Sequence, residues 1–186
     1  VSELAGLPIE DALAGIAHVV VPGRLQRIDE GQDYLAIVDY AHKPAAVAAV
    51  IATLRSEIKG RLCVVLGAGG DRDASKRAIM GREAARGSDL FIVTDDNPRS
   101  EDPAVIRAAV EAGAYELPTE ERGEVRNIGD RAAAIRAAIA WAEPGDAVLV
   151  AGKGHETGQN VNGVIHHFDD REEVRAALQE RRTGSL

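Results

Sequence analysis

The stretch Leu90-Phe-Ile-Val-Thr-Asp-Asp-Asn-Pro-Arg99 joins a short apolar run to a polar turn. Residues 90–94 are apolar or β-branched and too few for a helix, which is typical of a strand buried on both faces of a parallel sheet. Pro98 stiffens the turn, and Asn97 before it is biased to extended conformations. Ligands of open α/β sheets bind beyond the carboxyl ends of the strands. This turn is therefore the first candidate for a binding site.

The same succession of apolar run, polar turn and amphipathic segment recurs along the chain. It predicts further strands at 34–38, 61–66, around 125–128 and at 147–151, with helices at about 44–58, 73–85, 103–112 and 131–142. Asn160-Val-Asn-Gly163 predicts a hairpin turn, and 164–168 a strand that returns antiparallel. The alternation predicts an α/β fold: a Rossmann-like open sheet of about six strands, mostly parallel, with one antiparallel edge strand at its end and helices on both faces.

Helix starts are marked by side chains that accept hydrogen bonds from the backbone. Asp73, Asp102 and Asp130 are each expected to cap the helix that follows. Asp169 and Glu172 have the spacing of a capping box for the last helix.

The composition limits the classes of protein to which the chain can belong. It has 186 residues, a net charge of −8 and 45% hydrophobic residues, which fits one domain, or one domain plus a remnant of another. The acidic balance argues against nucleic-acid and anionic-membrane partners. Cys63 is alone within a predicted strand, which indicates a core residue and no disulfide framework. No signal peptide and no apolar run of roughly 18 residues occur, so a soluble, cytoplasmic protein is expected.

The first 23 residues differ from the rest of the chain. A short amphipathic helix at 9–16 and a Pro-Gly break before Arg24 predict that residues 1–23 are the end of a preceding domain and a linker, with residues 24–186 forming one domain. The chain begins at Val1 without an initiator methionine, which indicates a fragment.

Polar side chains with complementary chemistry follow several of the predicted strands. Arginine presents two parallel donors to a carboxylate, so Arg72 and Arg99 are candidates for binding one. Asp96 and Glu156 suit an ammonium group, and Asn97 suits either partner. Simpler roles remain open at this point. Arg72 can pair with Asp71 or Asp73 and Arg99 with Glu101, while His42 and His155 can form local hydrogen bonds.

Other kinds of site match the chain poorly. Gly67-Ala-Gly-Gly-Asp-Arg72 follows a strand as a dinucleotide-binding turn does, but Arg72 stands where the third glycine is needed. A tight turn with positive φ accounts for Gly69 and Gly70. The chain has no phosphate-binding P-loop and no Cys/His set with zinc spacing. No metal site is predicted.

Five segments in order carry a resemblance to a known family: Pro22-Gly-Arg24, Asp39-Tyr-Ala-His-Lys-Pro44, Gly69-Gly-Asp-Arg-Asp73, Asp96-Asn-Pro-Arg99 and Gly152-Lys-Gly-His-Glu156. They resemble the carboxyl-terminal part of the Mur ligases, and within these the members that add meso-diaminopimelate in peptidoglycan synthesis. The resemblance covers nearly the whole chain. It implies a carboxyl-terminal, amino-acid-binding Rossmann-like domain.

The resemblance also implies roles for particular residues. Family members use ATP and Mg²⁺ to activate a carboxylate as an acyl phosphate, which the incoming amine attacks. The implied contacts to meso-diaminopimelate fall on Arg72, Asp96, Asn97, Pro98, Arg99, Gly152 and Glu156. The implied contacts to ATP fall on Arg24 and Asp39, with His42 near the nucleotide. No residue of this chain is assigned a catalytic role.

The resemblance also implies that important parts of the enzyme are missing. The P-loop, the Mg²⁺ ligands and the pocket for UDP-N-acetylmuramoyl-dipeptide belong to the two earlier domains of the family, so the isolated chain is expected to have no ligase activity. Arg99 favours diaminopimelate over lysine as the amine, because lysine-adding members lack this arginine. Alternatives are a lysine-adding or folylpolyglutamate-type ligase of the same superfamily, and a non-catalytic ligand-binding module.

Overall fold

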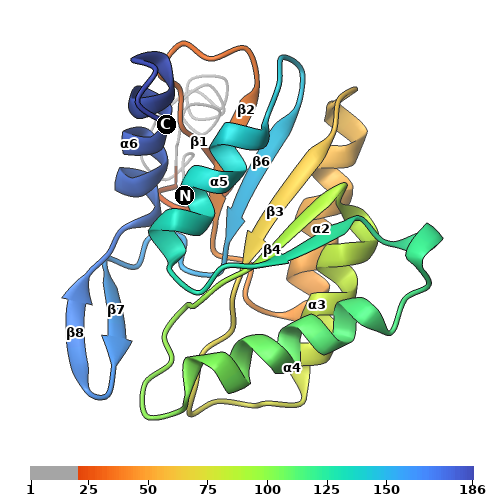
Figure 1. Ribbon diagram of the computed structural model, residues 1–186, viewed down its shortest axis with the longest axis vertical. Coiled ribbons are helices and arrows are strands. Elements are labelled where there is room, and N and C mark those ends of the chain that lie inside the picture. Colours follow the sequence, from red (N-terminus) through yellow and green to blue (C-terminus); the bar gives the residue numbers. More distant parts are fainter. Residues whose placement is uncertain (1–20) are drawn as a thin grey trace, which may run out of the picture.

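The computed structural model describes residues 21–186, in which six strands form one sheet (Figure 1). The strand order is β1-β2-β6-β3-β4-β5, and every neighbouring pair is parallel except β1 with β2. A separate hairpin, β7–β8, follows the central strand β6. The elements are β1 (Gln26–Arg27), β2 (Leu35–Asp39), α2 (Pro44–Glu57), β3 (Leu62–Leu66), α3 (Lys76–Gly87), β4 (Leu90–Val93), α4 (Pro103–Tyr115), the 3₁₀ helix η1 (Thr119–Glu121), β5 (Glu124–Asn127), α5 (Arg131–Trp141), β6 (Ala147–Ala151), β7 (Gly158–Val161), β8 (Val164–His167) and α6 (Asp170–Arg182).

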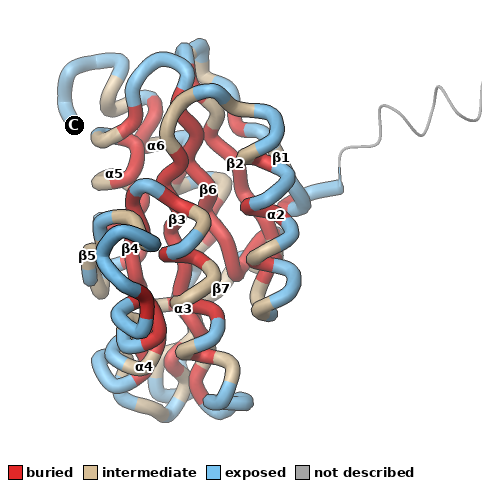
Figure 2. Tube along the Cα trace, turned by 90° about the vertical axis from the view of Figure 1, so that its right-hand side faces the viewer, coloured by how far each residue is buried: buried red, intermediate tan, exposed pale blue. Residues whose placement is uncertain are grey.

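The sheet is covered on both faces, as the apolar runs predict. Within β3, Val64 packs toward α2, α3 and α4, whereas Cys63 and Val65 pack toward α5 and α6. All five residues of β3 and of β6 are buried. Figure 2 shows these strands as buried chain between helices whose outer surfaces are exposed. The predicted α/β class, the mostly parallel sheet and the buried position of Cys63 are confirmed.

The antiparallel edge strand is not the one predicted. Residues 164–168 were expected to join the sheet, but β8 pairs only with β7, and the hairpin projects from the body of the domain (Figure 1). Its turn is as predicted, with positive φ at Asn162 and Gly163. The antiparallel edge strand is β1. It has only two residues, too few to show an alternating pattern.

Two of the predicted helix caps are confirmed. The Asp102 carboxylate accepts from the backbone N–H of Ala104, with Pro103 as the first helical residue, and the Asp130 carboxylate accepts from Ala133. Helix α4 extends further than predicted, to Tyr115, so the loop after it is shorter.

The prediction for Asp73 is wrong, and that for Asp169 and Glu172 is confirmed only in part. Helix α3 begins only at Lys76, and Asp73 instead accepts from the backbone N–H and hydroxyl of Ser75 within the preceding turn. Asp169 does cap α6, but Glu172 does not complete a capping box. Its carboxylate accepts a hydrogen bond from His167 Nε2 at 2.6 Å, which ties the hairpin to α6.

The helix predicted at 9–16, and most of the proposed linker up to residue 23, lie outside the described residues. Among the helices of residues 21–186, none combines the length and the apolar character that crossing a membrane requires.

Candidate functional site

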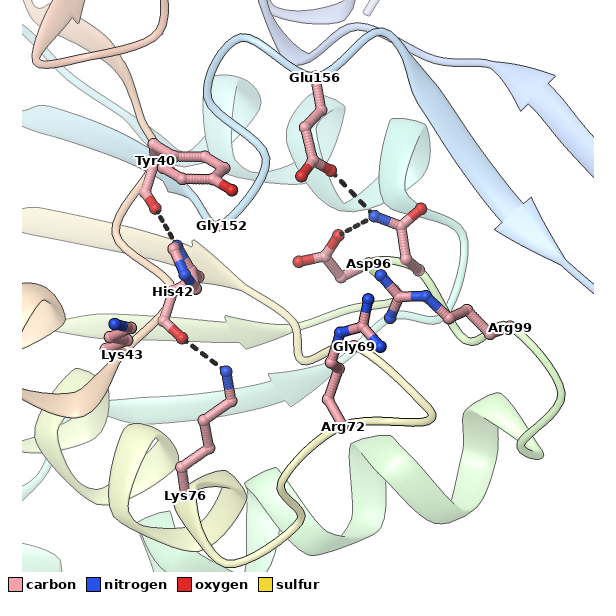
Figure 3. A pocket seen from close by; sticks show the side chains of 11 residues that line it. Tyr40, His42, Lys43, Gly69, Arg72, Lys76, Asp96, Arg99, Gly152 and Glu156 are labelled. Carbon is pink, nitrogen blue, oxygen red and sulfur yellow. Dashed lines mark hydrogen bonds between the residues drawn. The ribbon is translucent and has the colours of Figure 1, made fainter.

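The loops that follow β2, β3, β4 and β6 meet at the carboxyl edge of the sheet and enclose a pocket of about 270 Å³ (Figure 3). Its position follows from the parallel sheet, since the carboxyl ends of parallel strands share one edge. The sequence-predicted residues that line it are His42, Arg72, Asp96, Asn97, Arg99, Gly152 and Glu156. Tyr40, Lys43, Gly69 and Lys76 complete the lining and were not predicted.

One wall of the pocket is acidic and is held together by Asn97. The Asn97 amide donates to Asp96 Oδ1 at 3.2 Å and to Glu156 Oε2 at 3.0 Å. Its carbonyl oxygen accepts from the backbone N–H of Asn160 in the hairpin at 2.9 Å, which fixes the orientation of the amide. The side chain therefore uses both N–H donors within the protein, and its role is to set the two carboxylates side by side.

Behind this wall lies Lys153, which sequence analysis missed. Its Nζ donates to the carbonyl oxygen of Gly158 at 2.6 Å and lies within 4 Å of both Asp96 and Glu156. The only sequence signal was a lysine between two glycines directly after a buried strand.

A second unexpected cation, Arg131, is buried beneath the same loops. It donates to the two carboxylate oxygens of Asp170 at 2.7 and 2.8 Å and to the carbonyl oxygen of Ala151 at 2.9 Å. Burial alone would lower the pKa of Arg131, but the Asp170 carboxylate more than offsets this and the pKa is raised. The pair fixes the start of α5 and of α6 to the end of β6.

The opposite wall carries two guanidinium groups. Arg72 donates to the carbonyl oxygen of Asp71 at 3.0 Å, and Arg99 donates to that of Gly70 at 2.6 Å. Within residues 21–186 neither guanidinium has a carboxylate partner within 4 Å. The simpler roles considered for them, ion pairs with Asp71 or Asp73 and with Glu101, are therefore wrong. Glu101 instead pairs with Arg77 at 2.8 Å, and that hydrogen bond lowers the pKa of Glu101.

Arg99 has an unusual backbone conformation that the hairpin stabilises. Its φ is +52°, in the left-handed region that residues other than glycine seldom adopt. Its N–H donates to the carbonyl oxygen of Asn160 at 2.9 Å, and its carbonyl oxygen accepts from Asn162 at 2.6 Å. The hairpin thus holds the arginine that faces the pocket.

Glycines allow the loops to approach one another closely. A Cβ on Gly70 would lie 1.9 Å from the carbonyl oxygen of Pro98, and one on Gly69 would lie 2.9 Å from Arg99 Nη1. Neither glycine has a positive φ, which corrects the sequence-based explanation; in this turn the positive φ belongs to Asp71, at +53°. Pro98 contributes backbone to this contact, and its side chain is not part of the pocket lining.

Gly152 serves a different purpose. Its φ is +116°, and a Cβ at this position would lie 2.9 Å from Asp96 Oδ2. Glycine is therefore required here both by the backbone and by the neighbouring carboxylate.

An aromatic corner built around Tyr40 forms the remaining side. The Arg24 guanidinium lies 4.8 Å from the centre of the Tyr40 ring, a cation–π arrangement. The rings of His42 and His155 lie 4.5 and 5.0 Å from that of Tyr40. His42 Nδ1 is 2.8 Å from the Tyr40 carbonyl oxygen, so one ring nitrogen is used locally.

Asp39 connects this corner to the sheet. Its carboxylate accepts from the backbone N–H groups of Leu25 and Ala41, both at 2.7 Å. Asp39 and Arg24 are thus adjacent to Tyr40 but are not part of the pocket lining. Lys76 Nζ donates to the His42 carbonyl oxygen at 3.0 Å, which leaves two of its N–H donors for a ligand.

No group of three or more His, Cys, Asp or Glu side chains within residues 21–186 is arranged to hold a metal ion.

Comparisons with known proteins indicate the family of the chain. The family model described as Mur ligase, glutamate ligase domain, matches residues 23–154. A protein of Corynebacterium glutamicum named UDP-N-acetylmuramoyl-L-alanyl-D-glutamate–2,6-diaminopimelate ligase is 63% identical over 97% of this chain and 35% of its own length. A protein of the same name from Corynebacterium efficiens is 69% identical over 89% of this chain and 32% of its own length.

Among solved structures, one titled with the same ligase name is 39% identical, with a TM-score of 0.79. It matches over 97% of this chain and 36% of the solved chain. The chain spans about a third of the length of the curated relatives it matches.

Proposed function

Because this chain belongs to the Mur ligase family, as a glutamate ligase domain, we propose that it is the carboxyl-terminal domain of a ligase that adds meso-diaminopimelate to UDP-N-acetylmuramoyl-L-alanyl-D-glutamate. The names of relatives at 63% and 69% identity support this assignment. The complete enzyme would use ATP to activate the carboxylate of the muramoyl dipeptide as an acyl phosphate. Because ATP and a nucleotide-linked sugar are its substrates, the reaction would take place in the cytoplasm.

The observation that carries the proposal is the charge pattern of the pocket. Among the described residues, Arg72 and Arg99 have only carbonyl oxygens as partners, whereas Asp96 and Glu156 stand together on the facing wall. An amino acid carries a carboxylate and an ammonium a few ångströms apart, and diaminopimelate carries such a pair at each end. One end would fit between the two walls, with guanidinium on carboxylate and carboxylates on ammonium.

The contribution of this domain to the reaction would be positioning. With one end of diaminopimelate bound, the amine at its other end is free to attack the acyl phosphate. Holding two reactants in the geometry of attack removes translational and rotational entropy from the barrier. The residues that would bind diaminopimelate are Arg72, Asp96, Asn97, Arg99, Gly152 and Glu156, with Asn97 and Gly152 acting through the acidic wall and Pro98 through the loop contact with Gly70.

The aromatic corner is the proposed place at which this domain meets ATP. Arg24, Lys43 and Lys76 put positive charge beside His42 and Tyr40, which suits phosphate groups. Asp39 would act by holding the segment of Arg24 through the Leu25 N–H. Most of the nucleotide site and the Mg²⁺ ligands would lie in the part of the enzyme that precedes this domain.

Titration calorimetry of the full-length protein with meso-diaminopimelate and with lysine tests the proposal. Diaminopimelate is expected to bind on the order of tenfold or more tightly. When the α-amine of lysine is kept for the reaction, the end of lysine left for the pocket has an amine but no carboxylate for Arg72 and Arg99. Preference for lysine, or for glutamate with a folate acceptor, would identify one of the other ligases of the superfamily. Binding of an amino acid by a full-length protein that has no ATP-dependent turnover would identify a binding module instead.

A further inference from the structure

Lys153 lies at the base of the acidic wall but does not reach the pocket surface. Its side chain is 0% exposed, and its Nζ lies 3.5 Å from Asp96 Oδ1 and 3.7 Å from Glu156 Oε2. A buried ammonium is costly unless charged and hydrogen-bonding partners compensate it. Here two carboxylates and the Gly158 carbonyl oxygen do so.

The two carboxylates each divide their oxygens between the protein and the pocket. Asp96 Oδ1 and Glu156 Oε2 face both Lys153 and the Asn97 amide. Within residues 21–186, the other two oxygens, Asp96 Oδ2 and Glu156 Oε1, accept no hydrogen bond. In Figure 3 these oxygens point away from the dashed bonds, on the side of the pocket where Gly152 lies.

The charges of this group match a single bound cation. Two carboxylates and one ammonium sum to a net charge of −1, which one ligand ammonium neutralises. Without Lys153 the two carboxylates would lose the cation that lies within 4 Å of both, and their mutual repulsion would act against holding them side by side. Asn97 could not replace the lysine, because an amide fixes geometry but brings no net charge.

We propose that Lys153 is a positioning residue for amine recognition. It holds Asp96 and Glu156 with one oxygen each toward the pocket. Its own positive charge leaves the three side chains with a net charge of −1, which one ligand ammonium neutralises. The ligand class is a diamino acid whose non-reacting amine occupies this position. The inference rests on the proposed function, since it concerns the same pocket.

A pair of amino acids that differ by one amine tests this role in the full-length ligase. meso-Diaminopimelate carries two amines, and 2-aminopimelate keeps both terminal carboxylates but only the amine that must react. Lys153→Met removes the charge at similar length. It is expected to raise the KM for diaminopimelate on the order of tenfold or more, while the KM for 2-aminopimelate and that for ATP change by less than about twofold.

A merely structural lysine would give a different result, because a distorted loop would weaken both amino acids alike. An equal loss for diaminopimelate and 2-aminopimelate would therefore overturn the proposal. Arg61→Met is the matched control: it removes a cation from the largely buried Asp146 at the opposite edge of the sheet, and it should leave both KM values unchanged.

Folding and function can be separated within the same experiment. If Lys153→Met does not fold, Lys153→Gln takes its place, because glutamine keeps an N–H donor without the charge. The KM for diaminopimelate should then rise relative to the KM for 2-aminopimelate, as expected for Lys153→Met. Failure of both variants to fold would make Lys153 a structural residue and overturn the proposal. A wild-type enzyme that shows no preference for diaminopimelate over 2-aminopimelate would instead contradict the proposed function.

Discussion

Replacing Arg99 by glycine and by alanine in the full-length ligase separates the effect of its side-chain charge from the effect of its backbone conformation. Both variants lose the guanidinium that faces the pocket. A hydrogen bond to a charged group contributes about 1.5–3 kcal/mol, so the KM for meso-diaminopimelate should rise on the order of tenfold to a hundredfold. Steady-state kinetics with each substrate varied in turn measures this rise. The KM for ATP should change little, because Arg99 lies outside the aromatic corner.

The two variants should differ in stability rather than in affinity. The left-handed conformation at φ +52° costs an L-residue about 1–2 kcal/mol, and glycine avoids that cost. Thermal unfolding should therefore find Arg99→Gly more stable than Arg99→Ala, by up to about 1 kcal/mol once the greater chain entropy of glycine is subtracted.

Arg126→Ala is the control, because it removes a partly exposed arginine that pairs with Glu124 on the edge strand β5. It should leave both KM values unchanged. An unaltered KM for diaminopimelate in Arg99→Gly would refute the role of the guanidinium. A rise in Arg99→Ala alone would show that the conformation of the loop, and not the charge, matters.

Three further experiments test other parts of the structure. Gly152→Ala should raise the KM for diaminopimelate in the same kinetic assay, because its Cβ would lie 2.9 Å from Asp96 Oδ2; an unchanged KM would show that the loop absorbs the methyl group. Burial raises the pKa of the Cys63 thiol, so a thiol-specific reagent at pH 8 should label it only after unfolding; labelling of the folded protein would contradict its place in the core. The hydrogen bond to Glu172 raises the pKa of His167, so any stability from this link is present at low pH and is lost as the pH rises through the raised pKa. An NMR titration should find that Glu172→Gln returns this pKa toward its ordinary value of about 6.5.

The features predicted correctly from sequence are those that short stretches encode. The apolar run before Asp96 is a strand, and parallel strands bring their following loops to one edge, so Arg72, Arg99 and Glu156 line the same pocket as expected. Asp102 and Asp130 cap helices because the hydrogen bond spans only a few residues.

The features missed depend on contacts between distant parts of the chain. Lys153 resembles a surface lysine until the hairpin brings the Gly158 carbonyl to it. Arg131 and Asp170 each stand at the start of a helix in the sequence, and only the packing of α5 on α6 makes them a buried pair. The ion pair with Glu101, left open as a simpler role for Arg99, is wrong because Glu101 turns toward Arg77 on α3.

The strand order also has a consequence for synthesis on the ribosome. β6 emerges after the other five strands of the sheet and then inserts between β2 and β3, which do not pair with each other. A nascent chain that ends before residue 147 therefore has two half-sheets with open edges, the kind of surface that chaperones protect from aggregation. Gly152 and Glu156 follow this strand directly, so the ligand pocket is completed only after β6 and the loop behind it have been synthesised.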